Sequence, residues 1–117
     1  MKMTVRELME KIDATCLTPD ANLDAEISCG YSCDLLSWVL AHGKAGMAWC
    51  TVQTHVNVIA VSVLMEMACV ILVEGVEAEE ASLKKAIDEE MPVLSTNKTA
   101  YEICVMMGQA GILPPVE

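Results

Sequence analysis

The most constraining feature of the sequence is a long apolar segment, AWCTVQTHVNVIAVSVLMEMACVILVEG, which runs from residue 48 to residue 75. Its polar residues gather near its start, at Gln53, Thr54, His55 and Asn57. A membrane span over residues 56–73 is unfavourable because it would place Glu66 inside the bilayer, where a carboxylate costs on the order of 2–3 kcal/mol or more. The segment also divides into a helical and an extended part, so we expect it to form the core or an interface.

The length and composition predict one domain, over residues 1–117, with an ordinary globular core. A chain of this size buries roughly two-thirds of its unfolded surface. Hydrophobic residues make up 54% of the sequence and aromatic residues only 3%, so the nine methionines are expected to fill gaps in the core. The net charge of −10 repels nucleic-acid backbones and anionic lipids, and we expect neither as a partner.

Six cysteines raise the question of disulfide bonds. The N-terminus, MKMTVRELMEK, has a charged helical pattern and lacks the apolar centre of a signal peptide. We therefore expect a cytoplasmic protein in which the cysteines remain free thiols and pack as small hydrophobic side chains.

Hydrophobic periodicity and capping signals predict alternating helices and strands. Thr4 and Glu7 have the spacing of a capping box, Gly43 is placed to end a helix, and Asn97 or Thr96 is expected to cap the last helix. The expected helices cover residues 4–12, 34–43, 54–67, 78–90 and 99–111, and the expected strands cover residues 25–31, 47–52, 69–75 and 92–96, with a short extended piece at 14–20.

The alternation of strands and helices with short connections predicts parallel strand pairing through right-handed crossovers. The run CVILV, residues 69–73, is typical of a parallel strand that is covered on both faces. The sequence therefore predicts an α/β fold, a small three-layer sandwich with a mainly parallel sheet.

The helix at residues 55–67 has too few polar residues for a surface helix. His55, Ser62 and Glu66 fall on one narrow stripe, whereas a surface helix gives about half of its circumference to water. The sheet can cover one side, and a second helix or a second subunit must cover the other. We predict a homodimer, because an isologous interface is the commonest solution. In the alternative, the N-terminal helix or helix 99–110 covers this helix within one chain.

Polar residues also gather where predicted strands end and helices begin. In open parallel sheets this edge is where ligands bind, and helix N-termini there present free N–H groups to anions. We expect a shallow pocket for a small polar or phosphorylated molecule, with Lys98 as its main cation. The candidate ligand-binding residues are Tyr31, Asp34, Gln53, Thr54, His55, Asn57, Thr96, Asn97 and Lys98. In the alternative, such residues only cap helices, with Thr54, Asn97 and Ser32 in that role.

No motif indicates catalysis. The sequence contains no G-x-x-x-x-G-K-[ST] loop, which excludes a P-loop phosphotransferase, and no G-x-G-x-x-G. Cys29 and Cys33 lie four residues apart, unlike a C-x-x-C redox or zinc pair. A thiol or metal site of Cys33, Cys50 and His55 stays open as an alternative. We therefore predict no catalytic residues, no metal and no cofactor.

The order of the motifs resembles the DRTGG domain family over nearly the whole chain. The resemblance rests on NLDAEISCGYSCDLLSWVL, AWCTVQTHVNVIAVS, CVILVEG and PVLSTNKTAYEI, in this order. The family's naming motif, Asp-Arg-x-x-Thr-Gly-Gly, corresponds to Asp24–Gly30, where Ala25 and Cys29 replace the Arg and one Gly. The better matches are Gly30–Ser37, Gln53–Asn57 and the Ser95-Thr96 turn.

The resemblance implies a fold similar to the N-terminal domain of HPr kinase/phosphorylase. Such domains occur alone or joined to phosphotransacetylase and to nucleotide-regulated pyrophosphatase modules. We therefore expect a non-catalytic regulatory or interaction domain that is homodimeric, that senses a small polar or nucleotide ligand at the strand ends, and that can partner a metabolic enzyme. The alternatives are a small thiol- or metal-dependent enzyme and a ligand-free scaffold subunit of a metabolic complex.

Overall fold

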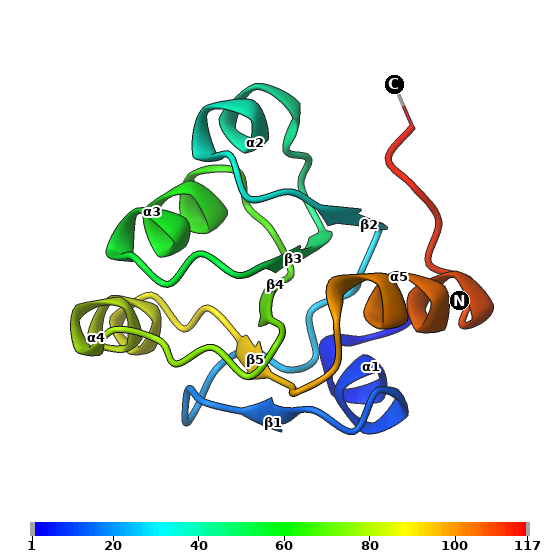
Figure 1. The fold of residues 1–117 in the computed structure, drawn as a ribbon, viewed down its shortest axis with the longest axis horizontal. Helices are drawn as coiled ribbons and strands as arrows, with labels where there is room; N and C mark the ends of the chain where they lie inside the picture. Colours follow the sequence, from blue (N-terminus) through cyan, green and yellow to red (C-terminus); the bar gives the residue numbers. More distant parts are fainter. Residues whose placement is uncertain (1, 117) are drawn as a thin grey trace.

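The structure is a computed structural model that describes residues 2–116. Helices and strands alternate along most of this range (Figure 1). In chain order the elements are α1 (Val5–Lys11), β1 (Thr15–Cys16), β2 (Cys29–Ser32), α2 (Leu36–His42), β3 (Met47–Thr51), α3 (Val56–Leu64), β4 (Cys69–Leu72), α4 (Glu80–Asp88), β5 (Val93–Ser95) and α5 (Ala100–Gln109).

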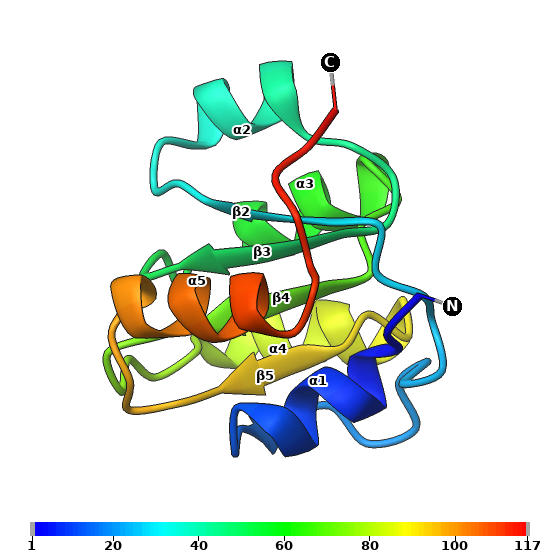
Figure 2. The same ribbon diagram turned by 90° about the vertical axis from the view of Figure 1, so that its right-hand side faces the viewer.

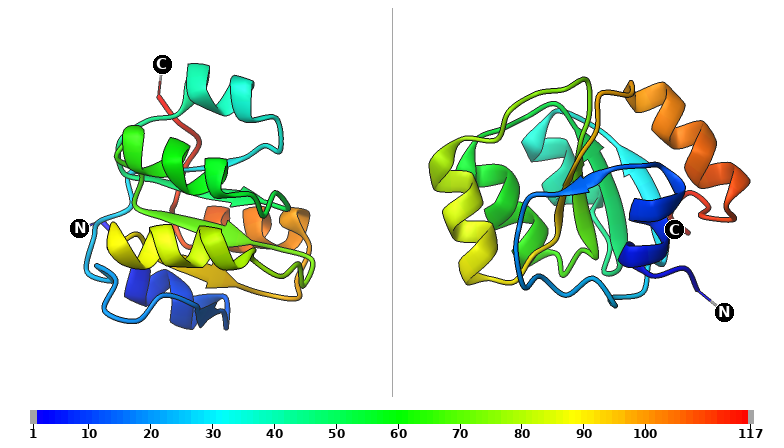
Figure 3. Two further views of the ribbon diagram at one scale, coloured as in Figure 1. Left: turned by 90° about the vertical axis from the view of Figure 1, so that its left-hand side faces the viewer. Right: turned by 90° about the horizontal axis from the view of Figure 1, so that it is seen from below.

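The strands form one sheet in the order β1-β5-β4-β3-β2. Strands β2 to β5 pair in parallel, and the short β1 pairs antiparallel with β5. Helices α2, α3 and α4 cover one face of the sheet, and α1 and α5 cover the other (Figure 1, Figure 3). The predicted three-layer α/β sandwich with a mainly parallel sheet is therefore confirmed.

Two hydrophobic cores, one on each face of the sheet, explain why the central strands are apolar along most of their length. In β3, Met47 and Trp49 pack under α2, α3 and α4, whereas Ala48 and Cys50 pack under α1 and α5. All four side chains are fully buried. Successive strand residues point to opposite faces, so a strand that is covered on both faces is largely apolar.

Helix α3 is shorter than predicted, and the expected polar stripe along it does not exist. The helix ends at Leu64, and Glu66 lies beyond it with a left-handed φ of 57°. Ser62 is fully buried, and its hydroxyl donates to the Ile59 carbonyl at 2.8 Å. The predicted stripe is wrong because the Ser62 hydroxyl is hydrogen-bonded within its own helix, so Ser62 packs as a small core residue.

Helix α3 is not covered by the N-terminal or the last helix, contrary to what the single-chain alternative predicts. Helix α3 lies in the middle of its layer, between α2 and α4 (Figure 1). Helices α1 and α5 pack on the opposite face of the sheet, so neither covers α3. The outward side of α3 is open in the single chain, where Leu64 is 69% exposed. Within residues 2–116, no helix combines the length and the apolar character that a membrane crossing requires.

Several helix ends differ from prediction by one to three residues. The capping box of Thr4 and Glu7 is confirmed. Helix α3 is capped by His55 instead of Thr54, and α5 by Thr99 instead of Asn97 or Thr96. Helix α2 has no side-chain cap, so Ser32 does not serve it, and Gly43 ends the helix in an extended conformation. Pattern reasoning locates a helix well but places its ends poorly.

The N-cap of α5 gives a measurable stability prediction. The Thr99 hydroxyl accepts a hydrogen bond from Glu102 N at 3.1 Å, and the Glu102 carboxylate accepts one from Thr99 N at 3.0 Å. Replacing Thr99 with Ala should lower the free energy of unfolding by about 1 kcal/mol, because a backbone donor loses its partner. Urea denaturation monitored by circular dichroism measures the change. Thr99→Ser keeps the hydroxyl and should stay close to wild type, so an equal loss in both variants would contradict the assignment.

The C-terminal tail protects the free edge of β2 (Figure 2). The Gly30 N–H donates to the Leu113 carbonyl at 2.9 Å. Pro114 and Pro115 follow at once, and proline has no N–H with which to continue a ladder. The tail therefore occupies part of the edge and prevents further strand pairing along it.

Candidate functional site

The carboxyl ends of β2 to β5 lie along one edge of the sheet, as the parallel topology requires. We call the residues of the connections that leave these ends, Cys33–Leu35, Val52–His55, Val73–Glu79 and Thr96–Thr99, the strand-end edge. Most of the predicted ligand-binding residues fall on it. They are distributed among three local hydrogen-bond groups.

The first group joins the ends of β2 and β3. The Asp34 carboxylate accepts hydrogen bonds from Thr51 Oγ1 at 2.8 Å and from Val52 N at 2.9 Å. The Gln53 side-chain amide donates to the Asp34 carbonyl at 3.0 Å. The structure thus brings Asp34 and Gln53 together, as predicted. Asp34 remains solvent-exposed although one carboxylate oxygen is engaged twice, so the other oxygen is available to a ligand.

The second group lies at the start of α3. Thr54 donates to Glu79 Oε2 at 3.3 Å, and its carbonyl accepts a hydrogen bond from Ser82 Oγ at 2.6 Å. The His55 Nδ1 atom accepts from Asn57 N at 3.1 Å, which makes His55 the N-cap. A ring nitrogen that accepts carries no proton, so His55 has its hydrogen on Nε2, and that atom is its remaining donor.

The third group lies at the end of β5. The Lys98 amide donates to Thr96 Oγ1 at 3.1 Å, and the Lys98 ammonium donates to the Ile12 carbonyl at 3.2 Å. Ile12 is the C-cap of α1, and a cation at that end of a helix is favourable. Lys98 is therefore directed to α1, on the other face of the sheet, and away from the residues at the start of α3.

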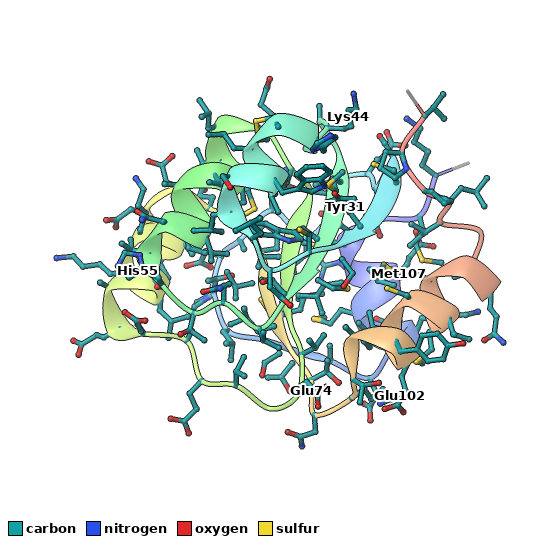
Figure 4. The ribbon with its side chains drawn as sticks, turned by 45° about the horizontal axis from the view of Figure 1, so that its top comes forward. Tyr31, Lys44, His55, Glu74, Glu102 and Met107 are labelled. Carbon is teal, nitrogen blue, oxygen red and sulfur yellow. The ribbon has the colours of Figure 1, made fainter. Side chains whose placement is uncertain are left out.

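Tyr31 also lies apart from the other candidates. It belongs to β2 and packs, partly buried, in the core beneath α2, whereas His55 lies at the N-terminal end of α3 (Figure 4). The strand-end edge thus gathers Asp34, Gln53, Thr54 and His55 along neighbouring connections, without Tyr31 and without the ammonium group of Lys98.

The cavities at this edge are small or shallow. A space of about 10 Å³, room for about one water molecule, is lined by Gln53, Thr54 and His55 above apolar side chains. A separate, open depression of about 300 Å³ is lined by residues that include Gly75, Glu77 and Asn97. Neither of these two cavities joins the three groups, and ligand binding at this edge stays a prediction.

The charge of the edge is negative. Asp34, Glu74, Glu77 and Glu79 are all exposed there, and the Lys98 ammonium is engaged by the Ile12 carbonyl. Carboxylates repel phosphate groups at short range. The edge therefore suits a neutral or cationic polar molecule better than a phosphorylated one.

The fold separates Cys50 from His55 in the thiol or metal alternative built on Cys33, Cys50 and His55. Cys50 is fully buried on the α1 and α5 face of the sheet, whereas His55 caps α3 on the opposite side. In the described part of the chain, no three His, Cys, Asp or Glu side chains are grouped as a metal site would need. All six cysteines are free.

The sequence reasoning missed one group of residues, formed by Ser32, Cys50 and Cys104. Ser32 and Cys50 are paired residues of the parallel strands β2 and β3, and Cys104 comes from α5. Hydrogen bonding from Cys50 outweighs partial burial and, with Ser32, lowers the pKa of Cys104 to about 6. The same hydrogen bond and burial raise the pKa of Cys50. Strand alternation places Cys50 on the face that α5 covers, but nothing in the sequence predicts which helix residue meets it.

A comparison with solved structures finds a similar fold in the regulatory region of Clostridium perfringens pyrophosphatase, a structure of CBS and DRTGG domains complexed with the activator diadenosine tetraphosphate. The TM-score is 0.74 at 10% sequence identity. The match covers 95% of this chain and 47% of that chain, so this chain spans about half of its length. The likeness confirms, for the fold, the resemblance drawn from the sequence. No model of a protein family matches the sequence, and no curated protein matches it.

Proposed function

We propose that this chain is a non-catalytic regulatory domain that acts as a homodimer and senses a small polar ligand at the strand-end edge. The observation that carries the proposal is the fold, which is similar to that of a regulatory region containing CBS and DRTGG domains. The local geometry supports it, because the only histidine of the edge is a helix cap whose Nδ1 atom is occupied. A histidine held in this way is a poor general base.

The surface formed by α2 and α3 supports the homodimer. Neither Leu36–His42 nor Val56–Leu64 contains a residue of Asp, Glu, Lys or Arg, although 21% of the chain is charged. The neighbouring surface helix α4 has four charged residues among nine. Trp38 is 52% exposed and Leu64 69% exposed in the single chain. Two adjacent helices without charge, carrying exposed large apolar side chains, form a surface suited to a second copy.

The ligand is proposed to bind beside Asp34 and Gln53. These residues connect the ends of β2 and β3, whose following helices α2 and α3 carry the proposed interface. A ligand there contacts the starts of both helices, so it can favour one packing of the dimer over another through differential contacts. The negative charge of the edge selects a neutral or cationic ligand over a nucleotide.

A thermal-shift panel tests the sensing proposal. It should include adenosine, spermidine, AMP, ATP and diadenosine tetraphosphate. A ligand at about 100 times its dissociation constant adds about 2.7 kcal/mol of stability, which is a shift of roughly 10 °C for a domain of this size. We expect a shift with a neutral or cationic compound. No shift with any compound would contradict sensing and favour the ligand-free scaffold.

The variant Asp34→Asn locates the site and reports its charge. Its side-chain oxygen can still accept from Thr51 and Val52, so the fold is spared. We expect binding of a cationic ligand to weaken about tenfold or more, whereas Asp88→Asn, at an exposed carboxylate on α4, should leave binding unchanged. Equal effects of the two variants would contradict the assignment. Stronger binding of a phosphorylated ligand to Asp34→Asn would place a nucleotide at the edge instead.

A further inference from the structure

The face of the sheet beneath α5 contains a cluster of small residues that lets the helix approach closely. Gly30 and Ala48 are paired residues of β2 and β3, and Ser32 and Cys50 form the next pair on the same face. A methyl group added at Gly30 would lie 3.2 Å from Met107 Cε on α5 and 3.2 Å from Ile112. Met107 occupies the space between α5 and β2 (Figure 4). The close approach lets α5 side chains pack directly on the strands.

Cys104 is another α5 residue that packs on this face of the sheet. It packs against the core cluster that contains Cys50 and lines a cavity together with Ser32. These two neighbours lower the pKa of its thiol. Donors that point at a sulfur favour the thiolate over the thiol. Cys16 and Cys33, the other partly exposed cysteines, are arranged the opposite way, because their thiols donate to the carbonyls of Thr18 and Leu35.

A cavity gives solvent access to Cys104 but not to Cys50. The cavity has a volume of about 390 Å³ and is lined by residues of β2, α5 and the C-terminal tail, among them Ser32, Cys104, Met107 and Leu113. Its lining is mostly apolar, and it is large enough for a peroxide or a small organic hydroperoxide. Cys50 is fully buried beneath it. A reagent that enters the cavity therefore meets Cys104 first.

We propose that Cys104 is a site of oxidation by hydroperoxides and that Cys50 is its resolving cysteine. The accessible thiolate reacts first, and the buried thiol of the same core cluster closes an intramolecular disulfide. The proposal stands on the cavity that Cys104 and Ser32 line, on the pairing of Ser32 with Cys50, and on the packing of Cys104 against the core cluster that contains Cys50. It is independent of ligand binding at the strand-end edge and of dimer formation.

The chemistry balances with a hydroperoxide as the only co-reactant. The Cys104 thiolate attacks the O–O bond, one oxygen becomes bonded to sulfur, and the other leaves as an alcohol, or as water when the oxidant is hydrogen peroxide. The product is a sulfenic acid. The Cys50 sulfur then attacks the sulfenic sulfur, the S–O bond breaks, and the hydroxyl leaves as water with the thiol proton. Two thiols lose two electrons, and the peroxide accepts them.

Peptide mapping of the reduced, full-length chain tests the first step. With limiting iodoacetamide at pH 6, Cys104 should be alkylated roughly tenfold faster than Cys16 and Cys33. At that pH its larger thiolate fraction outweighs the lower intrinsic nucleophilicity of a thiolate of low pKa. Equal alkylation rates at the three cysteines would overturn the proposal.

Hydrogen peroxide tests the second step. Treatment should give a protein lighter by about 2 Da, with the peptides of Cys50 and Cys104 linked. Cys50→Ser keeps a hydrogen-bond donor but cannot form the disulfide, so the sulfenic acid of Cys104 should persist and react with dimedone. Cys69→Ser, at another buried core cysteine, should still form the Cys50–Cys104 link. Links between other cysteines, or no link in the wild-type chain, would overturn the proposal, and this result needs no variant to fold.

Discussion

Replacing Trp49 with alanine is expected to lower the free energy of unfolding by about 4 kcal/mol. Trp49 lies at the centre of β3, between β2 and β4, and is fully buried in the core beneath α2, α3 and α4. Truncation removes its buried apolar area and leaves a cavity that the surrounding strands cannot fill. The loss is a large fraction of the 5–15 kcal/mol typical of a domain.

The indole N–H of Trp49 makes a smaller contribution to the free energy of unfolding, and a separate variant can measure it. It donates to the Cys33 carbonyl at 2.8 Å, at the point where the chain leaves β2 for the strand-end edge. Trp49→Phe keeps most of the apolar volume and orphans this carbonyl, so it should cost about 1–3 kcal/mol. Tyr101→Ala, at a side chain that is 81% exposed, should stay within about 0.5 kcal/mol of wild type. Urea denaturation gives all three values, and a loss below about 1 kcal/mol for Trp49→Ala would contradict the packing described here.

The substitution Leu64→Asp is expected to weaken the proposed dimer at least a hundredfold. Leu64 lies at the C-terminal end of α3, and its side chain is 69% exposed in the single chain. In a twofold dimer the substitution buries two unpaired carboxylates, one from each copy. Each costs about 2 kcal/mol or more, and every 1.4 kcal/mol is a factor of ten in the dissociation constant.

A matched substitution on the other face of the molecule separates dimer disruption from a general effect of charge. Val105 on α5 is 43% exposed and lies on the far side of the sheet from α3. Val105→Asp adds the same charge and should leave the dissociation constant within a few-fold of wild type. Sedimentation equilibrium measures both variants. Equal weakening of the dimer by both variants, or no weakening by either, would count against a dimer interface on α2 and α3.

The order and type of the elements could be predicted from the sequence because local signals and the global fold agree. The run CVIL of β4 is apolar at every position because α3 and α1 or α5 lie on its two sides. The amphipathic pattern of α4 is equally clear, since its outer face is charged and Ala86 is buried. Such segments carry the period of their secondary structure in the side chains themselves.

The details of the candidate site depended on tertiary contacts that a sequence does not display. Lys98 follows the last strand, as expected of a cation at the edge, but the C-terminal end of α1 lies close enough to bind its ammonium group. The sequence pattern places Ser62 in a polar stripe, but its hydroxyl donates a hydrogen bond within its own helix. Cys104 acquires its surroundings from β2 and β3, which precede it by more than fifty residues.

Light scattering of the wild-type chain over a range of concentrations tests the central claim most directly. A regulatory dimer built on the uncharged surface of α2 and α3 should have twice the chain mass of 12.6 kDa at micromolar concentrations. The measured mass of the Leu64→Asp variant should be that of a single chain. A wild-type mass of one chain at high micromolar concentration would contradict the proposed homodimer, and with it the mechanism in which a ligand acts through α2 and α3.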